Sequence, residues 1–309
     1  MKISEITEGA QFDGFYLFTA ASVKTTTNGS PFLNCKLRDQ SGEIDGKIWD
    51  YSGDIHTTCV GSIVKVRAKA QAYKDALQLI ISNIRPVRVD DNVNLLEIIP
   101  TAPIDPIGSE LRLRELLSSI DTEYQSICLK ILERQMGFFN IPAAKSIHHA
   151  FLHGLLMHVG SMMEVADKLA SVYPFVDRSL LLAGTFLHDI GKEREYLFSP
   201  VGLVTDYSRD GKLIGHPVMG AMQILETAKE LGLSEEKTTL LVHMALSHHG
   251  EPEWGAAVRP MFVEAELLNY IDLIDAKAEI YRETLERMEP GTFSETVKGL
   301  GRQIYKKTE

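Results

Sequence analysis

Histidine and aspartate side chains that could bind a metal ion lie together at the end of one apolar segment. In residues 180–196, LLLAGTFLHDIGKEREY, an almost unbroken apolar run ends at His188 and Asp189. Such a run predicts a buried helix, and adjacent residues of a helix point about 100° apart. Both side chains can therefore reach one cavity, where an imidazole and a carboxylate form a good half-site for a transition metal. The dipeptide alone also fits an ordinary histidine at a helix end.

Two residues that follow this pair add to the predicted site. Gly191 allows the backbone to turn after the helix, and Lys192 brings a cation to the same cavity. A lysine there can contact phosphate oxygens and offset the negative charge of a transition state. We therefore expect Asp189 and Lys192 to take part in catalysis.

The other candidate ligands are spread over successive predicted helices. Nine of the ten histidines fall between residues 148 and 249. The candidates outside the His-Asp pair are His158, His216, His248, His249 and Asp272. Asp272 lies in the apolar segment LLNYIDLIDAK, where an unpaired buried charge would be very costly. Together these residues predict a metal site with nitrogen and oxygen ligands.

Single members of this set allow plainer interpretations. His216 alone could be an ordinary helix N-terminal residue, and His153 and His243 are typical of core or surface histidines. Asp275 could orient a ligand or pair with Lys277. The joint pattern over several helices is what indicates a metal site.

The composition is that of a globular protein in a reducing compartment. The chain has 309 residues, 44% hydrophobic and 24% charged, which suggests roughly two domains. No run approaches the ~18 apolar residues of a membrane span, and the first residues are too polar for a signal peptide. The three cysteines are widely spaced and predict neither a disulfide framework nor a zinc finger. We expect a cytoplasmic protein without a membrane partner.

Charge is distributed unevenly along the chain. The formal net charge of −10 argues against a generally basic nucleic-acid binder. Residues 1–90, however, hold 11 basic and 10 acidic residues, whereas the remainder holds 21 basic and 32 acidic residues. The first part is much less acidic than the second, which permits an anionic partner there.

The hydrophobic pattern predicts a multidomain chain with α and β structure. Residues 1–90 hold five strand-like segments and a strong hairpin signal at Asn28-Gly29, which predicts a five-stranded OB-fold β-barrel. Prolines mark residues 91–108 as a linker, and residues 109–290 predict an all-α bundle. The helical segments are expected near 111–120, 123–136, 143–169, 178–190, 217–231, 234–248 and 260–288. Residues 291–309 form a polar, basic tail that we expect to be loosely held.

The pattern of these motifs resembles the HD-domain superfamily of metal-dependent phosphohydrolases. The resemblance implies that the metal ligands common to the superfamily are His158, His188, Asp189 and Asp272. The extra histidines of the subgroup that binds two metals match His216, His248 and His249. The subgroup that cleaves cyclic dinucleotides carries a GYP motif after its paired histidines. Here that place reads GEPEWGA, which argues against such a substrate.

A closer resemblance covers nearly the whole chain. It rests on five blocks: KTTTNGSPFLNCKLRDQSGEIDGKIWD, PAAKSIHHAFLHGLLMHVGSM, LHDIGK, LSHHGEPEWG and LNYIDLIDAK. LHDIGK alone indicates only the HD superfamily, but the order of all five resembles the YhaM-type 3′→5′ exoribonucleases of Gram-positive bacteria. The resemblance implies a cytoplasmic, Mn²⁺- or Co²⁺-stimulated nuclease that shortens single-stranded RNA, with single-stranded DNA as a further candidate substrate. The direction of cleavage comes from the resemblance alone.

Two divalent ions would supply the chemistry that phosphodiester hydrolysis requires. They provide a nucleophile, neutralise charge on phosphorus and help the leaving oxygen. Asp189 is the expected bridging ligand, because a carboxylate has two oxygens. The expected sets are His158, His188 and Asp272 for one ion, and His216, His248 and His249 for the other. Nitrogen and oxygen ligands without thiolate suit Mn²⁺, Fe²⁺, Co²⁺ or Ni²⁺ and could bind Zn²⁺. The preference for Mn²⁺ or Co²⁺ is what the resemblance implies.

The predicted barrel suits single-stranded nucleic acid, since OB-folds offer stacking aromatic residues beside a basic groove. The candidate stacking residues are Phe32, Trp49 and Tyr73, and the candidate backbone contacts are Lys36, Lys47, Arg67 and Lys74. His149, near the start of its helix, is a further candidate for substrate contact. An aromatic residue of a small barrel is also often part of the core.

Two other functions remain open from the sequence. The chain could be a phosphohydrolase of a small nucleotide, with the OB-fold used for assembly or regulation. It could also be a non-catalytic nucleic-acid-binding module with a structural metal, although such a site needs neither a second ion nor a free coordination position. The sequence leaves homo-oligomerisation open.

Overall fold

The structure of the chain is a computed structural model that describes residues 1–74, 76–94, 97–144 and 151–308. It divides into two compact units. One unit comprises Met1–Thr101 and Phe198–Thr205, and the other comprises Ala102–Leu197 and Asp206–Glu309. Within the described ranges, every helix is too short or too polar to cross a lipid bilayer.

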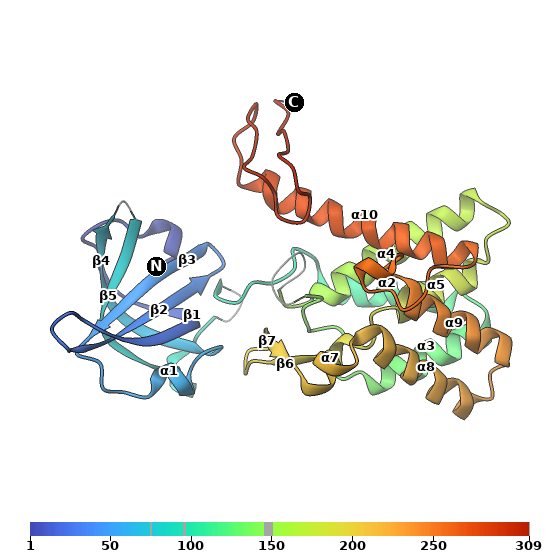
Figure 1. Cartoon of the computed structure of the whole chain (residues 1–309), viewed down its shortest axis with the longest axis horizontal. Helices are drawn as coiled ribbons and strands as arrows, with labels where there is room; N and C mark the ends of the chain where they lie inside the picture. Colours follow the sequence, from blue (N-terminus) through green and yellow to red (C-terminus); the bar gives the residue numbers. More distant parts are fainter. Residues whose placement is uncertain (75, 95–96, 145–150, 309) are drawn as a thin grey trace. The chain divides into compact units, whose positions relative to one another are not determined.

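The first unit is built on a closed β-barrel with the strand order β1-β2-β3-β5-β4 (Figure 1). Its strands are β1 (Gln11–Thr25), β2 (Pro31–Asp39), β3 (Gly42–Trp49), β4 (Ile63–Tyr73) and β5 (Ala76–Pro86). Neighbouring strands are antiparallel except β3 and β5, which run parallel. A five-stranded barrel with this order is an OB-fold, so the predicted fold of the N-terminal part is confirmed.

Alternation of side chains along the strands fills the barrel. In β2, Leu33, Cys35 and Leu37 are buried, whereas the residues between them are more exposed. Residues two apart in a strand point to the same face, so this alternation places one face in the core and the other in solvent. The turn between β1 and β2 has Gly29 at a φ of 86°, a value that glycine adopts without strain. Short helices that the sequence did not predict are η1 (Ile3–Glu5), α1 (Ile55–Thr58) and η2 (Val89–Asp91).

The second unit is mainly helical, which confirms the predicted fold class of this part. Its longer helices are α2 (Pro106–Ser118), α3 (Thr122–Arg134), α4 (Gly154–Val172), α5 (Arg178–Leu187), α8 (His216–Leu231), α9 (Glu235–Ser247) and α10 (Val263–Glu286). Four of them begin at a side chain that accepts a hydrogen bond from the first turn. These N-caps are Asp105, Asp121, Asp177 and Ser234. Such caps satisfy backbone donors that the helix leaves unpaired.

The prediction of helices alone was incomplete for residues 192–213. Here the chain forms two short helices, α6 (Lys192–Glu195) and α7 (Arg209–Leu213), around the two-stranded sheet of β6 (Tyr196–Phe198) and β7 (Val204–Tyr207). A short 3-10 helix, η4 (Pro252–Trp254), follows α9. Strands of three and four residues are too short to show a period of two in the sequence.

The helix that was predicted to run from residue 143 begins later than expected. It starts at Gly154, because His153 has a left-handed backbone with a φ of 61° that an α-helix does not accept. The His153 amide donates a hydrogen bond to the Asn140 carbonyl, and its Nδ1 lies 2.7 Å from the Phe139 carbonyl oxygen. Residues 145–150, near the start of the predicted segment, lie outside the described ranges.

Helix α5 lies at the centre of the helical unit, in contact with α3, α4, α9 and α10. All its residues from Leu180 to Leu187 are buried. A Cβ on Gly184 would overlap the side chain of Met244 in α9, so glycine allows these two helices to approach closely. Their last turns consequently end side by side. The rings of His188 and His248, which follow the two helices, have centroids 5.0 Å apart.

The last residues fold back as a hairpin (residues 291–308), named here the C-terminal hairpin, which follows α10 (Figure 1). Its two arms pair through bridges between Phe293 and Tyr305 and between Val297 and Arg302. Ile304 is 3% exposed. The segment that we expected to be loosely held is therefore ordered by backbone hydrogen bonds.

Candidate functional site

The predicted metal ligands lie on or directly next to helices around α5. They are His158 in α4, His188 and Asp189 after α5, His216 at the start of α8, His248 and His249 after α9, and Asp272 within α10. Most of these positions are helix ends, where the backbone leaves the apolar core. The packing of α5 against its neighbours thus decides which polar side chains meet.

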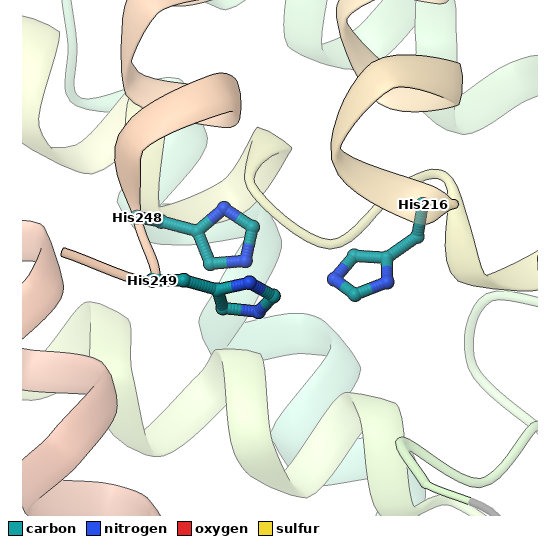
Figure 2. Close-up of side chains that lie close together, drawn as sticks. All are labelled: His216, His248 and His249. Atoms are coloured by element: carbon teal, nitrogen blue, oxygen red, sulfur yellow. The ribbon is translucent and has the colours of Figure 1, made fainter. Parts of the chain in front are cut away.

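The candidate ligands form two groups. The groups are His158, His188 and Asp272, and His216, His248 and His249. Within each group, one ligand atom from each residue lies within 4.8 Å of the others. Figure 2 shows the second group, in which the imidazole of His216 faces those of His248 and His249. The structure therefore brings together all six residues in the two sets that the sequence predicted.

Asp189 lies between the two groups and is 2% exposed. Its Oδ2 is 3.2 Å from His188 Nε2 and 3.5 Å from His158 Nε2. Its Oδ1 is 3.3 Å from His216 Nε2. Each oxygen of one carboxylate thus faces a different group, which is the position that a bridging ligand requires.

The donor atoms fit a divalent metal ion. Among the described residues, the buried Nε2 atoms of His188 and His216 make no hydrogen bond, although such a bond is normally required of a buried polar atom. Two ligand atoms that are each about 2.1 Å from one ion lie roughly 3.0–3.4 Å apart. The nitrogen–oxygen distances of 3.2–3.5 Å around Asp189 are close to this range. The donors are imidazole and carboxylate, which suit a transition metal.

The imidazoles are oriented by hydrogen bonds at their other nitrogen. His188 Nδ1 lies 2.7 Å from the Thr185 carbonyl oxygen, and His248 Nδ1 lies 2.8 Å from that of Ala245. A carbonyl oxygen only accepts, so Nδ1 carries the proton and Nε2 of the neutral ring keeps its lone pair. Both rings are therefore prepared to bind a cation through Nε2.

One histidine of each group has a carboxylate partner instead. His158 Nδ1 lies 2.7 Å from Asp275 Oδ2. His216 Nδ1 lies 2.9 Å from Glu195 Oε1, which also accepts the His216 amide at 2.9 Å. A carboxylate in this place fixes the ring and makes the opposite nitrogen a stronger ligand. Ser161 Oγ in turn donates to Asp275.

The charges of the two groups differ. Burial alone would lower the pKa of His158, but its hydrogen bonds with Asp189 and Asp275 raise it to about 9. Burial would raise the pKa of Asp189, but Lys192 and the surrounding histidines hold it well below its usual range. Burial and neighbouring histidines lower the pKa of His248 well below its usual value. His158 thus favours its protonated form, whereas His248 offers a neutral imidazole.

A cavity of about 200 Å³ borders both groups. Its lining residues are Ala143, His158, Asp189, Lys192, His249, Asp272, Leu273 and Ala276. Lys192 Nζ lies 2.6 Å from Asp189 Oδ2. The predicted cation therefore lies next to the Asp189 carboxylate, beside a cavity large enough for a phosphate group.

Gly191 has a different purpose from the one expected. Its φ of −65° is an ordinary helical value, so no special turn requires glycine here. A Cβ at this position would instead overlap the backbone of His216. Glycine permits the end of α5 to lie against the start of α8, which brings His216 to Asp189.

Two described histidines of the helical unit, His153 and His243, do not join the two groups. His153 bonds to backbone carbonyls, as described above, and His243 Nε2 accepts the Met261 amide at 3.1 Å. Both therefore have the structural roles that the sequence suggested. His149, the candidate for substrate contact, lies outside the described residues.

Five of the seven predicted barrel contacts gather on one surface, named here the barrel aromatic cluster (Phe32, Lys47, Trp49, Tyr73 and Lys74). The rings of Phe32 and Trp49 have centroids 5.1 Å apart. Lys47 Nζ lies 4.7 Å from the Tyr73 ring centroid and 5.6 Å from that of Trp49, and Lys74 Nζ lies 5.5 Å from that of Tyr73. Trp49 and Tyr73 are 46% and 50% exposed. The cluster combines open aromatic faces with cations.

The other two predicted contacts are engaged elsewhere. Lys36 Nζ lies 2.5 Å from Glu43 Oε1. Arg67 forms a two-pronged ion pair with Asp13, at 2.7 and 2.9 Å. These carboxylates offset the charges that we expected to be available for a nucleic-acid backbone.

Sequence reasoning missed Glu195 and left the role of Asp275 open. Glu195 lies in the charged run KERE after Gly191, which is typical of a solvent-exposed turn, yet it is 5% exposed. Nothing in the spacing of that run indicates that one carboxylate points inward. Asp275, three residues after Asp272, could have been found from its helical spacing, since residues three apart share a face.

Comparisons with known proteins agree with this arrangement. The family model described as "HD domain" matches residues 155–277, and the one described as "OB-fold nucleic acid binding domain" matches residues 19–87. The 3′-5′ exoribonuclease YhaM of Bacillus subtilis (strain 168) is 39% identical over 312 residues, which cover 97% of this chain and 96% of that protein. The 3′-5′ exoribonuclease YhaM of Halalkalibacterium halodurans is 37% identical over 302 residues, which cover 96% of this chain and 93% of that protein.

Removal of either carboxylate partner should weaken metal binding at one group. We expect Asp275→Asn and Glu195→Gln each to lower the affinity for one Mn²⁺ about 10- to 100-fold, because the supported histidine loses its orientation and basicity. Isothermal titration calorimetry with Mn²⁺ measures this change. Glu133→Gln, which changes an exposed carboxylate of α3, is the matched control and should bind as the wild type does. Wild-type affinity in both test variants would contradict the assignment.

Proposed function

Because the chain belongs to the YhaM family of 3′–5′ exoribonucleases, we propose that it degrades single-stranded RNA from the 3′ end by metal-dependent hydrolysis. The observation that carries the proposal is the position of Asp189, whose two oxygens face two groups of candidate ligands. A structural metal site would need only one group and would leave no cavity beside it.

The proposed ligands are those that the sequence indicated. One ion is assigned to His158, His188 and Asp272, the other to His216, His248 and His249, and Asp189 is shared between them. When bound, two divalent ions would activate water, neutralise charge on the scissile phosphate and assist the leaving oxygen. The two ions are proposed to be Mn²⁺ or Co²⁺, with Fe²⁺, Ni²⁺ or Zn²⁺ as alternatives.

Lys192 is assigned to the substrate phosphate. Its ammonium group is next to the cavity and next to Asp189. Burial would lower its pKa, but Asp189 outweighs this effect and raises the pKa, so the side chain stays charged. A fixed cation at this place would bind a phosphate oxygen and stabilise the additional negative charge that develops during hydrolysis.

The barrel is assigned to binding of the strand. The barrel aromatic cluster supports this assignment, because exposed aromatic faces stack bases and adjacent lysines contact phosphates. Lys36 and Arg67 remain candidate contacts of lower weight, because carboxylates already offset their charges. Single-stranded DNA is a further proposed substrate, since stacking on aromatic residues does not depend on the 2′-hydroxyl.

The proposal includes the organisation expected from the sequence. Residues 1–90 would bind the strand, residues 91–108 would link it to the catalytic part, and residues 109–290 would carry out hydrolysis, with residues 291–309 as a C-terminal extension. A cytoplasmic location is also proposed, in agreement with three cysteines that are all buried and unpaired.

A time course on 5′-labelled single-stranded RNA with Mn²⁺ tests the activity. We expect a ladder that shortens from the 3′ end. The variant His188→Ala/Asp189→Ala should show no ladder, because it removes ligands from both groups. Lys192→Ala should keep its metal but cut at least about 100-fold more slowly, as when a group that stabilises the transition state is lost.

Intact RNA with Mn²⁺, and again with Co²⁺, would contradict the exonuclease. Turnover of mononucleotides in the same assay would then favour a phosphohydrolase of small nucleotides. Binding of RNA by the double variant with wild-type affinity would show that its failure to cut is a loss of chemistry and not of folding.

Substitutions in the barrel aromatic cluster should weaken RNA binding without affecting metal binding. We expect Trp49→Ala to lower affinity for a 12-nucleotide RNA at least about fivefold, because base stacking on an aromatic ring contributes ~1–3 kcal/mol. Fluorescence anisotropy in EDTA measures the affinity without cleavage. Trp49→Phe should retain most of it, since the aromatic face remains.

Lys47, one of the two lysines of the cluster, has its own matched control. Lys47→Gln should reduce affinity and make binding less dependent on salt, because one phosphate contact is lost. Lys69→Gln removes the same charge from an exposed position of β4 outside the cluster and should have little effect. Equal losses in both variants would mean that net charge, and not this cluster, governs binding.

A further inference from the structure

The C-terminal hairpin has two faces with different environments. Gly291 donates to the Lys306 carbonyl at 2.7 Å, and Ser294 donates to the Ile304 carbonyl at 2.9 Å. Because the two arms pair as antiparallel strands, successive side chains point to opposite faces. Phe293 and Tyr305 lie directly opposite each other on one face, and Ile304 and Lys306 flank Tyr305 on the other.

The inner face is fixed to the end of α10. Ile304 is buried, and Lys306 Nζ donates to the carbonyl oxygens of Leu285 and Met288 at 2.8 and 2.7 Å. These carbonyls belong to the last turn of α10 and the residues that follow it, where the helix leaves acceptors unpaired. The lysine thus anchors the hairpin to a rigid element of the helical unit.

The outer face presents two aromatic rings to solvent. Phe293 is 69% exposed and Tyr305 is 48% exposed, and their ring centroids are 5.0 Å apart. Lys307 is also exposed and follows Tyr305 by two residues. The pair is held in place by the hairpin but is covered by neither its own arms nor α10.

The charge of the hairpin contrasts with that of the unit to which it belongs. Residues 287–309 hold five basic and three acidic residues, whereas residues 91–286 hold 16 basic and 29 acidic residues. Cations therefore outnumber carboxylates in the segment that carries the exposed rings, and Lys307 follows Tyr305 on the same arm. Such a combination complements a polyanion with flat, apolar bases better than it complements an acidic protein surface.

We propose that the outer face of the C-terminal hairpin is a second binding surface for the single-stranded nucleic-acid substrate. Phe293 and Tyr305 would stack bases, and Lys307 would contact phosphate. This inference rests on the proposed function, because it assigns the surface to the same strand that the metal centre cuts. The helical unit would then bind the strand through a surface of its own, in addition to the surface on the barrel.

The length of α10 sets the part of the strand that this surface would hold. From Asp272 to the last helical residue, Glu286, the chain advances 14 residues, or about 21 Å along the axis. A stacked strand covers this distance with about six nucleotides at ~3.4 Å each. Strands much shorter than this cannot occupy both the metal centre and the hairpin.

The double variant Phe293→Ala/Tyr305→Ala tests the proposal. We expect at least about a fivefold loss of affinity for a 5′-labelled 12-nucleotide RNA, measured by fluorescence anisotropy in EDTA, and a smaller loss for a 4-nucleotide RNA. Phe175→Ala changes another aromatic residue with 74% exposure and is the matched control. The double variant should keep the wild-type melting temperature, because both side chains are largely exposed.

Wild-type affinity for the 12-nucleotide RNA in the double variant would overturn the proposal. A lower molecular mass in light scattering, with RNA affinity unchanged, would overturn it in favour of an interface between copies of this chain. Both readouts are independent of cleavage. A wild-type protein that binds RNA through the hairpin but does not cut it would contradict the proposed function and leave this surface supported.

Discussion

The candidate metal site is arranged around one buried carboxylate, that of Asp189. A buried charge is costly unless other groups compensate it, and here His158, His188, His216 and Lys192 surround it within 3.5 Å. These residues come from the ends and faces of different helices, so the apolar packing that fixes those helices also assembles the site. The close approaches at Gly184 and Gly191 show that helix packing and the assembly of the site are connected. A substitution in the core near α5 should therefore displace the candidate ligands.

The grouping of the candidate ligands could be predicted because their chemistry conflicts with their sequence context. His188 and Asp189 end an apolar run, and Asp272 interrupts another, so a polar partner was required. Glu195 had no such contrast, since its neighbours are charged, and only the fold of α6 and α7 turns it toward His216. The late start of α4 and the small β6–β7 sheet also escaped prediction, because both depend on local backbone geometry and not on hydrophobic periodicity.

For the barrel, too, the sequence predicted the fold but not which of the surface cations remain available. Alternation along the strands and the Asn28-Gly29 turn were sufficient to predict an OB-fold. Which surface cations remain available depends on strand register, which a single sequence does not contain. The pairing of β2 with β3 brings Glu43 to Lys36, and Asp13 lies opposite Arg67. Pairing across the strands thus separates two of the predicted contacts from the aromatic cluster, although all seven looked equivalent in the sequence.

The central claim is that the two oxygens of Asp189 serve two metal ions. Electron paramagnetic resonance of Mn²⁺-loaded protein, combined with a metal count by equilibrium dialysis, tests this claim most directly. The account predicts two ions per chain with the spin-coupled spectrum of a close pair, and loss of that coupling in Asp189→Asn. One ion per chain, or two ions that give only the spectrum of isolated Mn²⁺, would contradict it.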